Sequence, residues 1–289
     1  MTAARALLAG MRPRQWVKNV LVVAGPIAAG RLFDATTLPA VLVAFGTFCL
    51  AASAIYLVND VLDREADRAH PTKRHRPVAS GALPIPLALV GALVLLVAAH
   101  AGALLAGYAE LAAVLGVYSV LQLAYCAWLK SLAVLELAVV ASGFLLRAVA
   151  GGAAADVALS PWFLLVASFG SLFVVAGKRF SEVAVMGEGQ GATRRTLELY
   201  SANYLRFVWS MAGAATLTFY SLWAFSLERE NLALPQLSVA PFVVALLRYA
   251  VDIDKGAAGE PETIVLGDRV LQALGVTWLA VFVASALVG

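Results

Sequence analysis

The sequence predicts an all-α polytopic membrane protein, because of its composition and the distribution of its apolar residues. Of the 289 residues, 62% are hydrophobic and 13% are charged, and the mean hydropathy is +0.85. Soluble domains carry a larger charged share, about 25%. Apolar stretches long enough to cross about 30 Å of hydrocarbon recur along the whole chain. We therefore expect one transmembrane domain, residues 1–289, with no separate soluble domain.

Nine apolar segments are expected to cross the membrane as helices. They cover residues 16–32, 38–58, 84–106, 109–128, 132–153, 161–177, 204–227, 235–250 and 269–288. Pro26 lies in the first and Pro241 in the eighth, and membrane helices tolerate proline where neighbours satisfy the freed carbonyl group. A basic segment before an apolar one also begins a signal peptide, but the many later spans favour a retained first helix.

The placement of Lys and Arg predicts the orientation in the membrane. If the N-terminus is inside, all of the 21 cationic residues except Arg31, Arg147 and Arg229 lie on the inner side. Cytoplasmic loops carry such an excess of positive charge. We therefore expect a multi-pass protein of the cell inner (plasma) membrane, with the N-terminus and the polar loops of the active site in the cytoplasm.

The most specific local signal is the sequence Asn59-Asp60-Val-Leu-Asp63-Arg-Glu-Ala-Asp67, at the end of the second span. On a helix, this spacing places the three aspartates on one face. Mg²⁺ binds such oxygen ligands through one or two carboxylates and keeps positions for water and substrate phosphates. The motif therefore predicts a magnesium site that holds a diphosphate. The alternative is a solvated helix end.

A basic loop bounded by prolines follows the acids, His70-Pro71-Thr-Lys73-Arg74-His75-Arg76-Pro77. The acidic helix is expected to stop before Pro71. The loop is then expected to bring its cations back over the end of the helix bundle where the acids lie. Lys73, Arg74 and Arg76 would then bind phosphate oxygens that the metal does not reach. Phosphoryl and pyrophosphate transfer use this arrangement, because negative charge grows on the leaving group.

A second basic cluster, Lys178-Arg179-Phe-Ser-Glu182, follows the sixth span. Lys130 and Lys18 lie on the same predicted side of the membrane, so these cations could surround one cavity. Cations at a helix end are equally well explained as anchors that reach the membrane surface. Both interpretations stay open at this point.

Arg147 and Glu136 lie well inside the fifth span. An arginine at the membrane centre costs about 2.5–3.5 kcal/mol on insertion scales, so Arg147 should face the interior of the helix bundle. The rise of a helix puts the two residues about 16 Å apart, which excludes a direct ion pair. Arg147 is then either a ligand of a lipid phosphate or a structural residue that reaches the outer interface.

Several common catalytic devices are absent from the sequence. His70, His75 and His100 lack the spacing of metal ligands, and Cys49 and Cys126 lack paired spacing. There is no Walker-type glycine loop and no Ser/His/Asp set. These absences fit a nucleophile that is already ionised, such as a phosphate monoester, because it needs no strong general base.

The acidic motif resembles the NDxxDxxxD signature of the UbiA-type intramembrane prenyltransferase superfamily, and nine helices with polar loops after the second and sixth fit that fold. Four further segments are similar to its decaprenyl-phosphate phosphoribosyltransferase branch: 11–19, 70–81, 177–179 and 247–256. The resemblance nearly spans the chain. It implies a UbiA-like bundle and transfer of 5-phosphoribosyl from phosphoribosyl diphosphate to a polyprenyl (decaprenyl) phosphate, for precursors of cell-wall arabinan.

The resemblance also implies site residues. Catalytic aspartates that hold Mg²⁺, together with Asn59, would be Asp60, Asp63 and Asp67. Substrate phosphates would be bound by Lys18, Asn59, Lys73, Arg74, Arg76, Lys130, Lys178 and Arg179, and Arg147 is a further candidate. Whether Glu182, Asp252 or Asp254 also binds metal stays open, as does closure of the loops 60–82 and 186–200 over the substrate.

Two other functions remain as alternatives. Many aromatic prenyltransferases of the superfamily carry a second Asp-rich motif where this chain has KRFSE, and cations there favour a phosphate as the second substrate. One alternative is nevertheless a prenyltransferase with a polyprenyl diphosphate donor and an aromatic acceptor. The other is a transporter for a phosphorylated solute. No nucleic-acid partner is expected, and the oligomeric state stays open, a homo-oligomer included.

Overall fold

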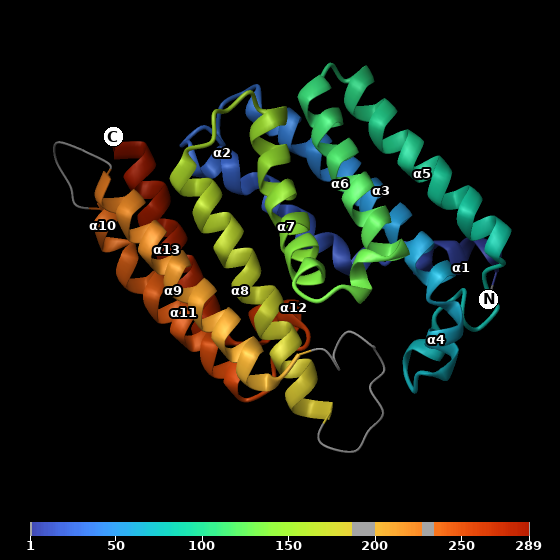
Figure 1. The fold of residues 1–289 in the computed structure, drawn as a ribbon. Coiled ribbons are helices and arrows are strands. Elements are labelled where there is room, and N and C mark those ends of the chain that lie inside the picture. The colour runs from blue at the N-terminus through green and yellow to red at the C-terminus, as the bar shows by residue number, and fades with distance from the viewer. Residues whose placement is uncertain (1, 187–199, 227–233, 289) are drawn as a thin grey trace. The chain divides into compact units, whose positions relative to one another are not determined.

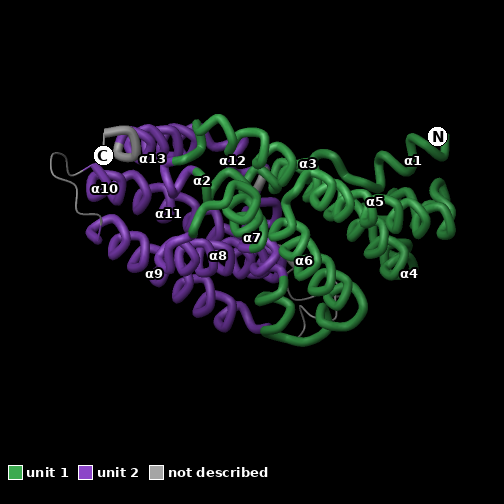
Figure 2. Tube along the Cα trace, turned by 90° about the horizontal axis from the view of Figure 1, so that it is seen from above, with its two compact units in different colours: residues 1–26, 31–139, 146–158 green, residues 27–30, 140–145, 159–289 purple. Residues whose placement is uncertain are grey.

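The computed structural model describes residues 2–186, 200–226 and 234–288. All regular elements in these residues are helices, as Figure 1 shows, which confirms the predicted all-α class. The chain divides into two compact units (Figure 2). Unit 1 comprises 1–26, 31–139 and 146–158, and unit 2 comprises 27–30, 140–145 and 159–289. The expectation of a single domain stays a prediction.

The helices of the described residues follow one another in two halves of the chain. The first half contains α1 (Ala3–Gly10), the 3₁₀ helix η1 (Pro13–Val23), α2 (Ala24–Ala28), α3 (Thr37–Leu62), α4 (Arg64–Ala69), η2 (Lys73–His75), α5 (Ile85–Leu105), α6 (Ala109–Ala127), η3 (Leu129–Ser131) and α7 (Leu135–Ala154). The second half contains α8 (Pro161–Met186), α9 (Ala202–Ser226), α10 (Leu234–Leu237), α11 (Val239–Asp254), α12 (Pro261–Gly267) and α13 (Arg269–Val288).

Six helical segments in the described part of the chain are long and apolar enough to cross a membrane. They are Thr37–Leu62, Ile85–Leu105, Ala109–Ala127, Leu135–Ala155, Pro161–Ala184 and Leu234–Asp254. These correspond to the second to sixth and the eighth predicted spans. The seventh predicted span is also a helix, α9, and the ninth falls on α13, whose described apolar part is shorter. The predicted number of nine transmembrane helices is therefore not confirmed.

The first predicted span differs from the expectation. In place of one α-helix, residues 13–23 form the 3₁₀ helix η1, and α2 adds only 5 residues. Pro26 accounts for part of this difference, because proline cannot donate the backbone hydrogen bond to the carbonyl group of Val22, four residues earlier. Valine also has a lower helix propensity than leucine or alanine, and η1 contains several valines.

Helix α3 is the centre of unit 1 and packs against α5, α6 and η1. Its Phe48 is fully buried and lies 5.0 Å from the ring of Tyr118 on α6, measured between ring centroids. Around them α3 and α5 bury mainly alanines, such as Ala44 and Ala99. Small residues let membrane helices approach closely, where van der Waals packing replaces the hydrophobic effect as the attraction between helices. A separate cluster packs the end of α3 that carries the acidic motif, where Leu57 is buried together with Leu83 and Ala88.

Candidate active site

The acidic motif lies where α3 ends and α4 begins. Helix α3 ends at Leu62, and Asp63 follows as its C-cap with φ −91° and ψ 5°. The backbone N–H of Asp63 donates to the carbonyl of Asn59, and that of Asp67 to the carbonyl of Asp63, each at 2.8 Å. The single helix that the sequence predicts is therefore interrupted at Asp63. Aspartate favours helix ends over helix interiors, because its side chain forms hydrogen bonds with nearby backbone groups in non-helical conformations.

Asp60 is buried, with 1% of its surface exposed. Its Oδ1 atom accepts hydrogen bonds from the guanidinium groups of Arg12 and of Arg76, the second at 3.4 Å. Its Oδ2 atom is also buried, and it has no hydrogen-bond partner in the described residues. Asp60 thus combines a charge-balanced oxygen with an unsatisfied one, which is unusual for a buried carboxylate.

Asp67 shares its cation with Asp60. The Nη1 atom of Arg76 donates to Asp67 Oδ2 at 2.7 Å, and Asp67 is 4% exposed. The loop that carries Arg76 is tied to α4, since the Nε atom of Arg68 donates to the carbonyl of Ala79 at 3.0 Å. Helix α4 ends at Ala69, before Pro71, as the sequence predicts. For Arg76, the predicted return of the basic loop over the acids is confirmed.

Asp63 has a different set of partners. Its Oδ1 atom pairs with the ammonium group of Lys130, which comes from η3 between α6 and α7. Its Oδ2 atom accepts a hydrogen bond of 3.0 Å from the side-chain amide of Asn59. The structure thus brings Lys130 to the acidic motif, whereas the sequence indicated only that the two lie on the same side of the membrane.

Arg12 is the site residue that the sequence analysis missed. It pairs with Asp60, and its guanidinium lies 5.1 Å from the centre of the Tyr56 ring. Its backbone has φ 54° and ψ 62°, a left-handed conformation that costs a non-glycine residue about 1–3 kcal/mol. The available signal was weak: an arginine that precedes Pro13, within a segment where only Lys18 received a role.

The other two cations of the basic loop, Lys73 and Arg74, have contacts with neighbouring residues of the loop. Arg74 is exposed, and its Nε atom lies 3.4 Å from the ring nitrogen of His75. Lys73 is half-buried in η2, where its backbone N–H donates to His70 at 3.3 Å. Their predicted role as phosphate ligands stays a prediction.

The donor set of the motif fits a hard divalent cation. Within the described ranges, no group of three or more His, Cys, Asp or Glu residues is arranged to hold a metal ion. Instead Asp60 and Asp67 converge on one nitrogen of Arg76, so a guanidinium occupies the position between the two carboxylates. The two converging carboxylates and the unsatisfied Oδ2 of Asp60 could serve as oxygen ligands of Mg²⁺ if Arg76 moved aside.

Arg147 lies in the interior of unit 1, 6% exposed. Its Nε atom donates to Asn19 Oδ1 at 2.7 Å and its Nη2 atom to the hydroxyl of Tyr118 at 3.3 Å. The guanidinium also lies 5.2 Å and 5.6 Å from the ring centres of Tyr118 and Phe48. This position agrees with the expected interior orientation and argues against an arginine that reaches the outer interface. A role toward a lipid phosphate stays a prediction.

The second basic cluster belongs to unit 2. Arg179 is buried and its Nη1 atom donates to Glu182 Oε2 at 2.6 Å, while the Nζ atom of Lys178 lies 4.0 Å from Oε1. Glu182 therefore neutralises two cations in this structure. Lys18 lies half-buried in η1 of unit 1. The idea that these lysines and arginines surround one cavity stays a prediction, and most of the loop 186–200 lies outside the described residues.

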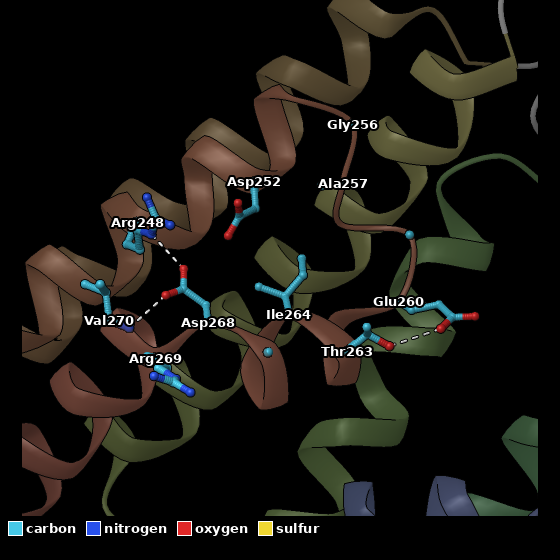
Figure 3. Close-up of a pocket in the computed structure, with 12 residues that line it drawn as sticks. Arg248, Asp252, Gly256, Ala257, Glu260, Thr263, Ile264, Asp268, Arg269 and Val270 are labelled. Atoms are coloured by element: carbon cyan, nitrogen blue, oxygen red, sulfur yellow. Dashed lines mark hydrogen bonds and ion pairs between the residues drawn. The ribbon is translucent and has the colours of Figure 1, made fainter.

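A pocket of about 780 Å³ lies in unit 2 at the ends of α11, α12 and α13 (Figure 3). Arg248 donates to Asp268 Oδ2 at 2.7 Å, and Asp268 Oδ1 accepts the backbone N–H groups of Val270 and Leu271 at 2.8 and 3.1 Å. Asp268 therefore caps α13, and its hydrogen bond with Arg248 lowers the pKa of its carboxyl. The sequence analysis did not predict this pocket.

The two late aspartates that the sequence left open as metal ligands differ in surroundings. Asp252 lines the pocket, and its Oδ2 atom is buried without a hydrogen-bond partner in the described residues. Asp254 is exposed and pairs with Arg206 at 3.3 Å. Asp254 thus takes part in an ordinary surface ion pair, of a kind that contributes about 0–1 kcal/mol to the stability of the fold.

Comparisons with known proteins identify the family of the chain. The sequence profile of the UbiA prenyltransferase family matches residues 20–271. The decaprenyl-phosphate phosphoribosyltransferase of Mycobacterium tuberculosis is 51% identical over 283 residues, which cover 96% of this chain and 93% of the relative. The enzyme of the same name from Corynebacterium glutamicum is 48% identical over 292 residues, 99% of this chain and 88% of the relative.

Solved structures agree at the level of the fold. The structure of a UbiA homolog from Archaeoglobus fulgidus bound to GPP and Mg²⁺ superposes with a TM-score of 0.73 and covers 98% of each chain, at 17% sequence identity. A structure of digeranylgeranylglyceryl phosphate synthase gives a TM-score of 0.69 over 99% of each chain, at 16% identity. At such low identity, the similarity establishes the fold alone.

Proposed function

The chain belongs to the UbiA prenyltransferase family, and from this premise we propose that it is a membrane-embedded phosphoribosyltransferase. It transfers the 5-phosphoribosyl group of phosphoribosyl diphosphate to a polyprenyl phosphate and releases pyrophosphate. The observation that carries the proposal is the identity of about one half, over nearly the full length, to relatives named decaprenyl-phosphate phosphoribosyltransferase in two genera. The name of these relatives makes decaprenyl phosphate the first acceptor to test.

The proposed setting is the cell inner membrane, with the acidic motif at the cytoplasmic side. The protein is multi-pass, and the excess of Lys and Arg at one side of its spans favours that side as cytoplasmic. One substrate is water-soluble and the other is a lipid, so a site at the membrane surface can receive both. The lipid-linked product would serve as a precursor of cell-wall arabinan.

Residues of the acidic motif and of the basic loop would bind the donor, phosphoribosyl diphosphate. Asp60, Asp63 and Asp67, with Asn59, would hold Mg²⁺, which when bound supplies positive charge to the departing pyrophosphate. Arg76, Lys73 and Arg74 would bind diphosphate oxygens. Two or more cations around the leaving group stabilise the negative charge that grows on it in the transition state.

The reaction is a displacement at the anomeric carbon of the ribose. The bond between that carbon and the diphosphate oxygen breaks, and its electron pair leaves with pyrophosphate. An oxygen of the lipid phosphate forms the new bond, and because it is already ionised no general base is needed. Most of the acceleration would come from positioning and electrostatics.

Lys178 and Arg179 would bind the phosphate of the acceptor. Lys178 and Arg179 stand where many aromatic prenyltransferases carry a second set of acids, and in this chain a single Glu182 lies beside them. Cations in this place are suited to an anionic acceptor and unsuited to a second metal ion. This favours a lipid phosphate over an aromatic acceptor as the second substrate.

The test is synthesis of the lipid product by the purified full-length chain. With Mg²⁺, labelled phosphoribosyl diphosphate and decaprenyl phosphate, thin-layer chromatography should reveal a labelled lipid and an equal amount of released pyrophosphate. Asp60→Asn should abolish both. Asp34→Asn is the matched control, because Asp34 pairs with Arg31 on an exposed loop and has no role in the site.

Other outcomes would refute the proposal. No labelled lipid with any polyprenyl phosphate would exclude it. Turnover of a polyprenyl diphosphate with an aromatic acceptor, in the absence of phosphoribosyl diphosphate, would make the chain a prenyltransferase. Flux of a phosphorylated solute into proteoliposomes, without a covalent product, would make it a transporter.

A further inference from the structure

The three acids of the motif pair with three cations from three separate segments, and one of these cations, Arg76, contacts both Asp60 and Asp67. Asp60 pairs with Arg12, which precedes η1, and Asp67 pairs with Arg76, which follows η2. Asp63 pairs with Lys130 of η3. The charges of these three carboxylates and three cations therefore sum to zero without any ligand.

A neutral, largely buried cluster disfavours a metal ion by itself. A divalent cation would add two positive charges to a site in which Asp60 and Asp67 are at most 4% exposed. Unbalanced buried charge is costly, because an ion that leaves water loses its hydration. The metal could bind only if a guanidinium left, and the displaced guanidinium would then lack an anion.

A diphosphate removes this difficulty. Its oxygens are strong acceptors for guanidinium groups, often in a bidentate arrangement. Arg76 is 23% exposed and Arg12 is 26% exposed, so both side chains reach from the buried acids to the surface, where a soluble diphosphate arrives. The left-handed backbone of Arg12 is a further sign that its side chain is held at Asp60 against a local preference.

We propose that Arg12 and Arg76 are exchangeable counter-ions that couple the binding of the metal to the binding of the diphosphate. Without substrate they neutralise Asp60 and Asp67. When the metal and the diphosphate bind together, the carboxylates pass to the metal and the guanidiniums pass to diphosphate oxygens. This inference rests on the proposed function, and it adds Arg12 to the residues that bind the diphosphate.

Removal of the charge on Arg76 should change the binding of the metal and of the diphosphate in opposite directions. Loss of the charge on Arg76 leaves Asp60 and Asp67 with less compensation, so the metal alone should bind more tightly. The same change removes a ligand of the diphosphate, so phosphoribosyl diphosphate should bind more weakly. If Arg76 were purely structural, its substitution would damage the site and weaken the binding of both ligands.

The experiment measures the two ligands separately on the full-length chain in detergent. Mn²⁺ alone serves as the metal probe, followed by electron paramagnetic resonance, and labelled phosphoribosyl diphosphate is measured by equilibrium dialysis with and without Mg²⁺. For the wild type we expect weak Mn²⁺ binding, and diphosphate binding that Mg²⁺ strengthens about tenfold or more. For Arg76→Gln and Arg12→Gln we expect Mn²⁺ to bind about tenfold more tightly, and Mg²⁺ to strengthen diphosphate binding much less.

Three controls sharpen the result. Arg64→Gln removes the same charge from a neighbouring side chain that pairs with Glu65, so it should leave Mn²⁺ affinity close to wild type. Asp60→Asn should weaken Mn²⁺ binding in every background. Arg12→Lys keeps the charge and should retain most of the coupling, which separates the role of the charge from that of the fold.

Defined results would overturn the inference. Equal Mn²⁺ affinity in wild type, Arg12→Gln and Arg76→Gln would do so, and so would an equal gain in Arg64→Gln. Unchanged Mn²⁺ binding in Asp60→Asn would place the metal elsewhere and would also exclude the coupling. These results are separate from the proposed function, because the lipid-linked product can form whether or not the two ligands bind cooperatively.

Discussion

Gly151 of α7 lies so close to the carbonyl oxygen of Val22 that a β-carbon on residue 151 would stand 1.6 Å from that oxygen. Val22 belongs to η1, and its carbonyl is the one that Pro26 leaves without its usual helical donor. The glycine thus allows η1 to lie directly against α7 within unit 1. The 3₁₀ segment that carries Asn19 and follows Arg12 depends on this close approach.

Gly151→Ala should destabilise the protein strongly. The added methyl group would overlap backbone atoms, which cannot move aside as a flexible side chain can, and overpacking typically costs about 1–3 kcal/mol. Cys49 and Cys126 are buried and free, so a thiol-reactive dye can follow thermal unfolding. Gly116→Ala is the control, because nothing lies within 4 Å of its added β-carbon. Equal melting temperatures for the two variants would contradict the prediction.

Arg147→Lys should destabilise the protein although it conserves the charge. Lysine cannot reproduce a fork that donates to both Asn19 and Tyr118, and loss of a buried hydrogen-bond set typically costs about 1–3 kcal/mol. Tyr118→Phe removes a single hydrogen bond and keeps the ring beneath the guanidinium, so its effect should be smaller, about 0.5–1.5 kcal/mol.

Thermal unfolding and the KM for decaprenyl phosphate, measured together, separate the two roles considered for Arg147. A structural arginine predicts lower melting temperatures and a KM close to wild type in the variant that still folds. A lipid-phosphate ligand predicts a raised KM at unchanged stability.

Removal of divalent metal should abolish turnover without unfolding the site. The acids are already neutralised by Arg12, Arg76 and Lys130, so the fold does not need the metal to balance them. With EDTA we expect no lipid product and a melting temperature within about 2 °C of the value in Mg²⁺, since a shift of that size corresponds to less than about 1 kcal/mol. A large metal-dependent rise in the wild-type melting temperature would contradict the prediction.

The ion pair between Arg248 and Asp268 should stabilise unit 2 at neutral pH and lose its effect in acid. The pKa of Asp268 is lowered in the folded state, chiefly by the hydrogen bond from Arg248. Its contribution is therefore fully present above the unfolded value, about 3.9, and is lost as the pH falls through the lower folded value.

The check compares wild type with Asp268→Asn across pH. The difference in melting temperature should be constant from about pH 8 to pH 5 and should shrink below about pH 4, near the unfolded pKa. A difference that already disappears between pH 8 and pH 6 would show that another group is responsible. The cap of α13 by Asp268 Oδ1 gives the carboxylate a second reason to stay ionised.

Local sequence patterns predicted the helical class, most of the long spans and the return of the basic loop. These features depend on hydropathy, on helix periodicity and on the proline after α4, all of which act over few residues. Arg76 was found in this way, since it lies only 16 positions after Asp60. The NDxxDxxxD spacing also named the three acids, although Asp63 turned out to stand at the break between two helices.

Contacts between distant segments could not be predicted in the same way. Arg12 is 48 positions from Asp60, and Lys130 is 67 positions from Asp63. Such pairs are set by how helices pack, and a single sequence carries no measure of that packing. The close approach of η1 to α7 was missed for a related reason, because it joins Val22 to Gly151, which is far away in the sequence.

The three segments that neutralise the acids also set an order for the biogenesis of the site. A chain emerges from the ribosome N-terminus first. Arg12 is therefore synthesised before Asp60, and Arg76 follows Asp60 by 16 residues. The interval is longest for Asp63, because its partner Lys130 is translated 67 residues later, after the membrane helices α5 and α6. During insertion this carboxylate passes through a stage in which Asn59 alone, of the partners described above, is present to support it.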